Sequence, residues 1–262
     1  MKKKINLFIL LAALLLLAGC EKEKLESNPE ITAHIAVKFA VVLEEKGYIA
    51  SAKKIKLSDV KNIKELYIAS EALTTISGIE YFEALTQLDC SMNQLANIDI
   101  SKNMALTYLD CSSNKLVNLD VSNNTELTRL ECGVNQLINL DVSKNTKLTD
   151  FGCSVNQLTG LDVSNNPELA FLGCSSNKLT HLNVSNNMAL RSLLCRTNQL
   201  VSIDISNTGL AYLDCSFNPG DGTKFVVIVD DEIPSIFGTG GWPMSNSYIT
   251  IDFQSQKAEI SE

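Results

Sequence analysis

A repeat that recurs at a fixed period constrains this chain more than any other feature. Segments that begin at Leu106, Leu127 and Leu148 read LTYLDCSSNKLVNLDVSNNT, LTRLECGVNQLINLDVSKNT and LTDFGCSVNQLTGLDVSNNP. Each copy follows the frame L-x-x-L-x-C-x-x-N-x-L-x-x-L-D-V-S-x-N, with small apolar exchanges. The cysteine of the frame recurs after 21 residues five times and then after 20. A strict period in this range predicts a solenoid, in which each turn packs against its neighbours.

Two residue columns follow from this frame. The segment around each cysteine alternates apolar and variable residues, which predicts a short strand with one side facing the core. An asparagine stands three residues after the cysteine, where the chain leaves the strand and inward-facing backbone groups have no hydrogen-bond partner in a neighbouring strand. Its side-chain amide both donates and accepts, so it can bond these groups. We therefore predict that the asparagines stabilise the fold rather than bind a ligand. The two columns are Cys90, Cys111, Cys132, Cys153, Cys174, Cys195 and Cys215, and Asn93, Asn114, Asn135, Asn156, Asn177, Asn198 and Asn218.

The first twenty residues predict export rather than a folded element. Lys2, Lys3 and Lys4 precede an apolar stretch that is too short for a normal spanning helix. The sequence Leu-Ala-Gly-Cys that ends at Cys20 resembles a bacterial lipobox, in which the cysteine is lipidated and becomes the mature N-terminus. The alternative is an ordinary secretory signal with a chance cysteine, and in either case the chain leaves the cytoplasm. We expect a lipid anchor at Cys20, in the outer membrane or at the cell surface.

The seven repeat cysteines are predicted to be reduced and buried. Eight cysteines in an exported protein normally suggest disulfides, and stacked Cα atoms about 4.8 Å apart do not exclude them by distance. However, side chains in one column point the same way, and seven is an odd number. Metal binding is disfavoured because there is no C-x-x-C pair and no histidine near the column.

The opposite side of each turn carries L-D-V-S, and its aspartates form another column. A column of acids could bind calcium, but such residues more often cap turns by bonding their own backbone. The glycine-rich nonapeptide of calcium-binding β-rolls is absent, so turn capping is favoured and calcium stays open. This column contains Asp99, Asp120, Asp141, Asp162 and Asp204, with Asn183 substituting once.

The frame resembles leucine-rich repeats, and its cysteine position and 21-residue length resemble the cysteine-ladder subclass of the internalin family. The resemblance covers roughly Ile63 to Asn218. It implies an α/β leucine-rich repeat solenoid with parallel strands on the concave face. It also implies a protein-binding or adhesive surface module. Gram-positive internalins often carry a cell-wall sorting tail, which is missing here, so the host and the partner are not carried over.

The chain divides into five predicted segments. These are a signal peptide (1–19), a lipidated tether (20–30), an N-terminal cap (31–62), the solenoid (63–218), and a C-terminal cap and tail (219–262). The solenoid begins with an imperfect repeat that has Ile68 in the cysteine position, so we expect about eight strands.

The two caps are predicted to cover the apolar ends of the solenoid. A helix is expected over Ile31 to Tyr48, with Gly47 as its C-cap. Short strands are expected over Phe225 to Val229 and Tyr248 to Phe253, which makes a small β C-terminal cap. We interpret Trp242 as a cap-packing aromatic rather than a binding residue.

Charge and residue placement favour binding over catalysis. The net charge of -8 disfavours nucleic acid and anionic lipid heads as partners. His34 is assigned to the cap and His181 to the side opposite the strands, so neither forms a catalytic grouping with the buried cysteines. We therefore expect no enzyme, no cofactor and no metal. The expected protein is a monomer that binds a protein or peptide.

The exposed residues of the strands do not pack in the core, so the fold does not fix which amino acids stand there. The amino acids found at these positions therefore carry information about binding. The early turns are acidic, whereas the later turns place aromatic residues beside Gly152 and Gly173. Aromatic residues and arginine beside small residues are typical of binding hot spots. The alternatives are scattered surface residues on an envelope scaffold without a ligand face, or a glycan-binding module. The candidate binding residues are Tyr108, Arg129, Phe171, Leu194, Arg196 and Tyr212.

Overall fold

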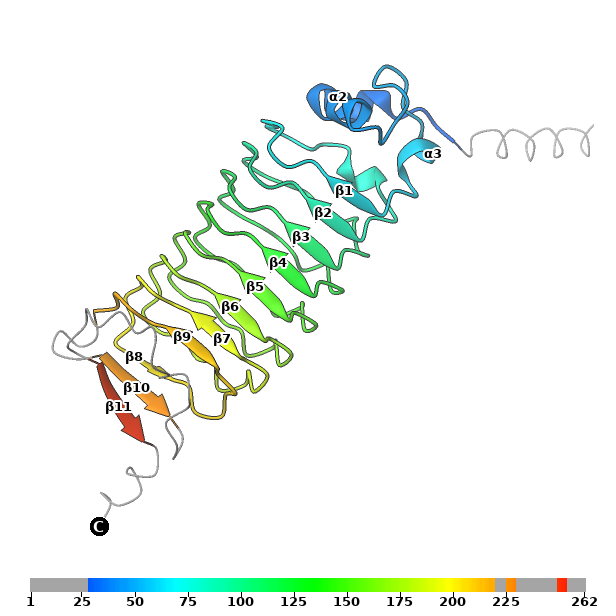
Figure 1. Ribbon diagram of the computed structural model, residues 1–262. Helices are drawn as coiled ribbons and strands as arrows, with labels where there is room; N and C mark the ends of the chain where they lie inside the picture. Colours follow the sequence, from blue (N-terminus) through cyan, green and yellow to red (C-terminus); the bar gives the residue numbers. More distant parts are fainter. Residues whose placement is uncertain (1–27, 220–224, 230–248, 254–262) are drawn as a thin grey trace, which may run out of the picture.

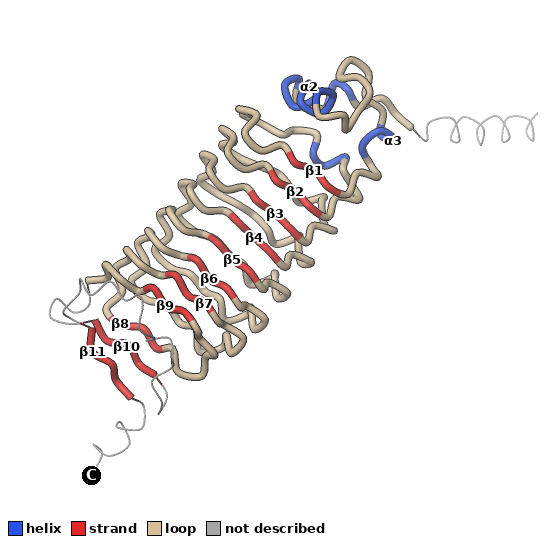
Figure 2. The backbone as a smooth tube through the Cα atoms, in the orientation of Figure 1, coloured by secondary structure: helices blue, strands red, loops and turns tan. Residues whose placement is uncertain are grey.

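The computed structural model describes residues 28–219, 225–229 and 249–253. The predicted signal peptide, Cys20, Trp242 and Tyr248 lie outside the described residues. Within them the chain is a solenoid whose turns stack along one axis, with the strands side by side on one face (Figure 1). Figure 2 shows that these strands are short and that most of each turn is loop. No helix in the described ranges is long and apolar enough to cross a membrane.

Eight parallel strands form one sheet, which confirms the predicted leucine-rich repeat solenoid. Each strand is three residues long and pairs with the strand of the next turn at the same frame position, as in Leu109 with Leu130. Their order along the sheet is β1-β2-β3-β4-β5-β6-β7-β9. The strands are β1 Glu65–Tyr67, β2 Gln87–Asp89, β3 Tyr108–Asp110, β4 Arg129–Glu131, β5 Asp150–Gly152, β6 Phe171–Gly173, β7 Ser192–Leu194 and β9 Tyr212–Asp214.

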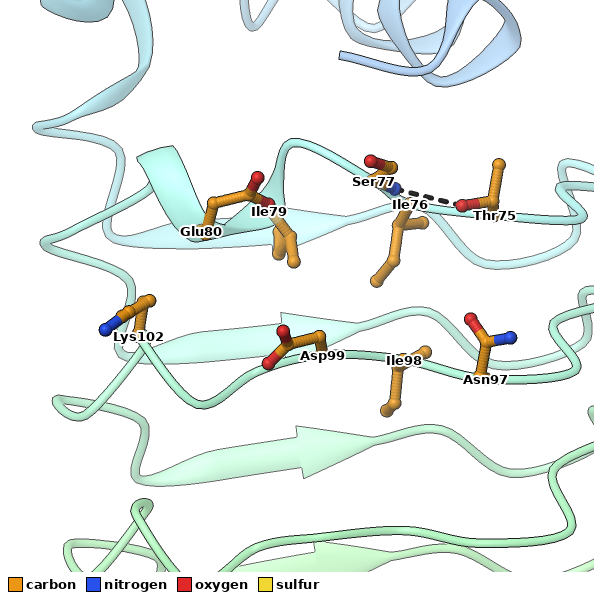
Figure 3. A pocket seen from close by; sticks show the side chains of 9 residues that line it. All are labelled: Thr75, Ile76, Ser77, Ile79, Glu80, Asn97, Ile98, Asp99 and Lys102. Atoms are coloured by element: carbon orange, nitrogen blue, oxygen red, sulfur yellow. Dashed lines mark hydrogen bonds between the residues drawn. The ribbon is translucent and has the colours of Figure 1, made fainter. Parts of the chain in front are cut away.

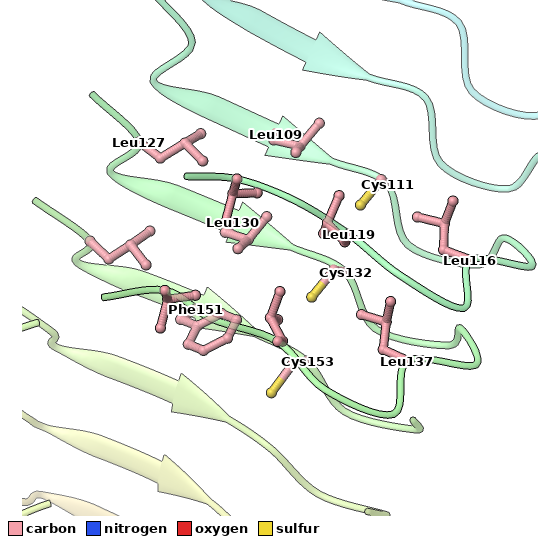
Figure 4. Packing of buried hydrophobic residues seen from close by; sticks show 14 of the residues in the cluster. Leu109, Cys111, Leu116, Leu119, Leu127, Leu130, Cys132, Leu137, Phe151 and Cys153 are labelled. Atoms are coloured by element: carbon pink, nitrogen blue, oxygen red, sulfur yellow. The ribbon is translucent and has the colours of Figure 1, made fainter. Parts of the chain in front are cut away.

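The core is a set of stacked columns (Figure 4). The central residue of each strand points inward, and Leu109, Leu130 and Phe151 are fully buried there. The cysteines follow directly after the strands, and the leucines and valines of the remaining frame positions fill the rest. Burying one leucine side chain contributes about 1.5–3 kcal/mol, so the repeated frame supplies most of the stabilisation.

The N-terminal helix is shorter than predicted. The α-helix α2 spans only Val37–Glu45 and is preceded by the 3-10 turn η1, Thr32–His34. The prediction was wrong for residues 31–36, because backbone groups there bond to distant segments, and for residues 46–48, which form the turn that ends the helix. The Ile31 amide donates to the Ile55 carbonyl at 2.8 Å, and the Ala36 amide donates to the Ser77 carbonyl at 3.0 Å. These bonds hold the segment against the rest of the cap and the first turn.

Gly47 ends α2, as predicted. Its φ is +77°, in the left-handed region that glycine adopts at low cost. The Gly47 amide donates to the Glu44 carbonyl at 3.0 Å, and the Tyr48 amide donates to the Leu43 carbonyl at 2.8 Å. This pair of bonds is a Schellman motif, which satisfies the last carbonyls of the helix. The other short helices are α3 Leu57–Val60 and η2 Ile79–Tyr81.

A second parallel sheet lies on the other side of the last turns. It contains β8 Ser202–Asp204, β10 Phe225–Val229 and β11 Ile249–Phe253, in the order β11-β10-β8. Because β8 is the L-D-V-S segment of its turn, β10 takes the place of that segment in the following turn, with Val227 paired to Ile203. Val227 is fully buried and joins the core. The C-terminal strands therefore continue the L-D-V-S side rather than the eight-stranded sheet.

Candidate functional site

The cysteine column is chemically inert in the folded chain. All seven residues from Cys90 to Cys215 are free and buried. Burial raises the pKa of the Cys174 thiol from its ordinary value to about 12, and a backbone hydrogen bond opposes this only in part. Reactive cysteines need a lowered pKa and exposure. The column therefore serves packing and supplies no nucleophile.

The asparagines that follow the cysteines use their side chains to satisfy the backbone. Asn156 is representative, since its Nδ2 donates to the carbonyls of Cys132 and Cys153 at 3.1 and 3.0 Å. Its Oδ1 accepts from the Leu137 amide at 3.0 Å. The residue before each of these asparagines has a positive φ, as in Val155 at 59°, and this sharp turn directs the amide inward. A side chain engaged in this way is not available to a ligand.

A second buried asparagine column had no role in the sequence analysis, although the last position of the frame contains it. Asn145 is representative, because its Nδ2 donates to the carbonyls of Val121 and Asn124 at 3.0 and 2.8 Å. Five asparagines repeat this arrangement and are fully buried. They are Asn103, Asn124, Asn145, Asn166 and Asn187. The recurrence of asparagine at a fixed frame position was the signal that could have identified them.

The aspartates of the L-D-V-S side cap their own turns. Asp120 Oδ1 accepts from the Ser122 amide at 2.9 Å, and the same bond recurs in the neighbouring turns. Hydrogen bonds from the Ser122 hydroxyl and amide hold the pKa of Asp120 below its ordinary value. Within the described ranges, no three acidic, cysteine or histidine side chains converge as a metal site would require. His181 lies on this side and contacts the Thr180 hydroxyl through Nδ1 at 3.0 Å.

A cavity of about 280 Å³ also opens on the L-D-V-S side, between the imperfect first turn and the next one (Figure 3). Ile76, Ile79 and Ile98 line it together with Glu80 and Asp99. The isoleucines belong to the core or pack against it, and Asp99 is one of the turn caps. This cavity is therefore lined by residues that already serve the fold.

The eight-stranded sheet presents a further set of side chains that serve neither core nor turns. We call this surface the strand face, defined by the outward positions of β1 to β7 and β9 and by the residue after each cysteine. The structure places the predicted binding residues here but not in a single cluster. Tyr108, Arg129, Phe171 and Tyr212 occupy the first position of β3, β4, β6 and β9, Leu194 ends β7, and Arg196 follows Cys195.

Two arginine–aromatic contacts occur on the strand face. The Arg129 guanidinium lies 5.7 Å from the centre of the Tyr108 ring, and its Nη2 is 3.1 Å from Glu131 Oε1. The Arg196 guanidinium lies 5.3 Å from the centre of the Phe217 ring. These contacts restrict the arginines, so less conformational entropy remains to be lost when a partner binds.

Tyr67 is a strand-face residue that the predicted set omitted. It ends β1 and its side chain is 42% exposed. Its hydroxyl donates to Gln87 Oε1 at 2.8 Å and lies 3.1 Å from Glu65 Oε2. An aromatic residue at an outward strand position was the available signal. With Tyr67 included, aromatic side chains extend from the first strand of the sheet to the last.

The strand face is acidic, and two of its strands end in glycine. Six carboxylates occupy its strands against two arginines, and the acids are Glu65, Asp89, Asp110, Glu131, Asp150 and Asp214. The third residue of β5 and of β6 is glycine, and both Gly152 and Gly173 are buried. The Glu131 carboxylate lies over Gly152, where a Cβ would collide with it, and the Phe171 ring lies over Gly173. Neighbouring side chains therefore fill the places that a side chain of residue 152 or 173 would take.

The solved structures that resemble this chain are leucine-rich repeat proteins. The functional domain of InlJ from Listeria monocytogenes, which includes a cysteine ladder, matches with a TM-score of 0.59 and 27% identity. Internalin C2 from Listeria monocytogenes matches with a TM-score of 0.62 and 17% identity, over 77% of this chain and 97% of that chain. The plant peptide hormone receptor RGFR1, in complex with RGF2, matches with a TM-score of 0.51 and 21% identity. This match covers 67% of this chain and 30% of the receptor chain.

These matches confirm the predicted resemblance to internalin-type repeats with a cysteine ladder. The InlJ match covers 86% of this chain, and the chain spans 62% of the InlJ domain. The internalin C2 and RGFR1 matches support the fold alone. No family model matches the sequence, and the search of curated proteins found no match.

Proposed function

We propose that this chain is a binding module that holds a protein or peptide partner on its strand face. The observation that supports the proposal most strongly is that different positions of each turn serve different purposes. The cysteine, asparagine and aspartate columns serve packing and backbone hydrogen bonds. The strand face instead presents Tyr67, Tyr108 and Tyr212, together with two arginines, on one parallel sheet. Rigid aromatic side chains and arginine are the residues that contribute most to protein interfaces.

The comparisons support the same class of function. RGFR1 is a receptor for a peptide hormone and was solved in complex with RGF2, so this fold can hold a peptide ligand in at least one protein. The role that we propose for this chain is adhesion or capture of a partner at a surface, since its basic and apolar leader predicts export.

The binding experiment is a selection from a randomised peptide display library against the immobilised protein. We expect enriched peptides whose binding falls about tenfold for each strand-face aromatic replaced, as at other interface hot spots. The test variants are Tyr108→Ala and Tyr212→Ala. The matched controls are Met104→Ala and Met188→Ala, which remove exposed side chains from loops outside the strand face. Peptides that bind all four variants equally, or a library that yields no enriched peptide, would contradict the proposal and favour a scaffold.

We further propose that Cys20 carries a lipid anchor, which places the module at the outer membrane or the cell surface. The support is the basic and apolar leader that ends in Leu-Ala-Gly-Cys. The Cys20→Ala variant should move from the membrane fraction to the soluble fraction of exported protein, and protease added to intact cells should remove the wild-type protein. If Cys20→Ala stays as firmly membrane-bound as the wild type, the anchor is wrong. Protection of the wild type while a periplasmic marker survives would place the module inside the envelope.

A further inference from the structure

One exposed frame position on the L-D-V-S side lacks a side chain in the middle of the solenoid. The residue directly before the L-D-V-S segment is asparagine in three consecutive turns, Asn97, Asn118 and Asn139, and then changes to Gly160 and His181. Gly160 is exposed, its φ lies outside the left-handed region, and a Cβ there would meet no atom within 4 Å. The backbone therefore does not require glycine, and the missing side chain leaves open space.

This space belongs to an open surface pocket of about 800 Å³. The volume falls in the range of about 300–1,000 Å³ that is typical of small-molecule sites. Asn139 and His181 line the pocket in the turns on either side of Gly160, and Thr159 lines it beside the glycine. The side chains of Asn139 and Thr159 are exposed and form no hydrogen bond within the described residues. Unlike the cavity near Ile76, this pocket is lined by polar side chains that do not serve the fold.

The polar groups of the pocket can both donate and accept hydrogen bonds. Asp141 and Asp162 each use Oδ1 to accept from a backbone amide of their own turn, at 2.8 and 2.9 Å. A carboxylate can accept about four hydrogen bonds, so both keep capacity for a ligand. Asn183 Oδ1 accepts from the Ser185 amide at 2.9 Å, and its Nδ2 has no partner within the described residues. Amide donors from Asn139 and Asn183 thus stand beside carboxylate acceptors.

The pocket also has an apolar part. Leu140 and Leu161 belong to the core, but each is 9% exposed and lines the pocket. Among the described residues that line it there is no lysine or arginine, so an anion would meet two carboxylates without a balancing cation. A cation would pair with the carboxylates but would leave the amide donors without an acceptor. A sugar ring fits both parts, because its hydroxyl groups donate and accept and its C–H face is apolar.

We propose that the pocket at Gly160 binds a neutral monosaccharide unit of a glycan. The sugar hydroxyls would donate to the carboxylates of Asp141 and Asp162 and accept from the neighbouring amide groups, and the C–H face of the ring would lie against the two leucines. This site lies on the L-D-V-S side, whereas the proposed protein or peptide partner binds the strand face. The inference therefore adds a second ligand class to the proposed function and does not depend on it.

The direct test is a titration of the purified, ¹⁵N-labelled protein with the methyl glycosides of glucose, galactose, mannose and N-acetylglucosamine. Binding is followed through the backbone amide resonances of Gly160 and His181. We expect at least one glycoside to shift both resonances with a Kd of about 1–10 mM, as befits a small ligand in an open pocket. The anionic methyl glucuronide and the cationic N-acetyl-lysine methylamide should leave both resonances in place.

The decisive variant is Gly160→Asn, which restores the residue of the three preceding turns and fills the pocket. It should weaken the glycoside more than tenfold, read from the His181 resonance, without lowering the unfolding midpoint, because a Cβ there meets no atom. Asp162→Asn should weaken it about tenfold through the loss of a charge-assisted hydrogen bond. Asn118→Ala is the matched control, since it changes the same frame position outside the pocket and should leave binding unchanged.

The sugar site is wrong if no glycoside shifts both resonances, if the lysine derivative shifts them more strongly than every glycoside, or if Gly160→Asn binds as well as the wild type. Shifts confined to the amides of Tyr108 and Tyr212 would place the sugar on the strand face and would equally refute the pocket. The peptide selection reads out the strand face, so either proposal can fail while the other stands.

Discussion

Replacing Asn156 with alanine should lower the free energy of unfolding by roughly 3–5 kcal/mol, because three hydrogen bonds of a buried side chain are lost together. The Leu137 amide loses its acceptor, whereas the carbonyls of Cys132 and Cys153 each keep a second donor, from Asn135 and Asn177. A buried backbone group left without a partner costs about 1–3 kcal/mol, and each of the two other lost hydrogen bonds contributes about 0.5–1.5 kcal/mol. Urea denaturation followed by circular dichroism measures the change.

The matched control for Asn156→Ala is Asn165→Ala. Asn165 stands in the same repeat and is exposed, so its replacement should change the free energy of unfolding by less than about 0.5 kcal/mol. Equal and small effects of the two substitutions would mean that the asparagine column does not hold the turns together.

Gly78→Ala should destabilise the protein by about 2–4 kcal/mol, through both strain and steric overlap. Gly78 has a φ of +103°, and a Cβ at this position would lie 2.6 Å from Ile35 Cγ1 and 2.9 Å from Ile35 Cα. Ile35 is buried, and its backbone cannot move away easily because the next amide, that of Ala36, is bonded to the Ser77 carbonyl at 3.0 Å. The substitution therefore tests how the N-terminal segment packs on the first turn.

Gly160→Ala is the corresponding control. A Cβ at Gly160 meets no atom within 4 Å, and its φ lies outside the left-handed region. Alanine there should be neutral or raise stability by a few tenths of a kcal/mol, because it restricts the unfolded chain. If Gly78→Ala unfolds at the same urea concentration as Gly160→Ala, the close contact between Gly78 and Ile35 is not present in solution.

The sequence predicted the solenoid because each position of the frame has one physical task that recurs in every turn. An inward leucine, a small cysteine and a backbone-bonding asparagine can be recognised from spacing alone, and the register of the sheet follows from the period. The end of α2 was also predictable, since Gly47 has a conformation that favours glycine.

Features that depend on contacts between distant segments could not be predicted in the same way. The start of α2 is set by bonds from Ile31 and Ala36 to segments more than twenty residues away, and no local pattern encodes them. Likewise, β10 pairs with the L-D-V-S side through Val227 and Ile203. The residues that precede β10 do not follow the repeat frame, so the frame could not predict this pairing.

The strand face was the least predictable part, because its residues are not constrained by the fold. Their outward positions followed from the alternation of the strands, but the way Glu131 lies over Gly152 and Phe171 lies over Gly173 depends on rotamers and neighbours. The sequence marked the two glycines as small residues beside aromatics. The structure shows that the Glu131 carboxylate and the Phe171 ring cover them.

The central claim is that the strand face is the binding surface, and the affinity of one enriched peptide for two matched double variants tests it most directly. Tyr108→Ala/Tyr212→Ala removes two aromatic side chains from the strand face, and Met104→Ala/Met188→Ala removes two exposed side chains from outside it. We expect the Kd to rise about 100-fold for the first variant and to remain within about twofold of the wild type for the second. Equal affinities for both variants, with unchanged unfolding midpoints, would contradict the assignment of binding to this face.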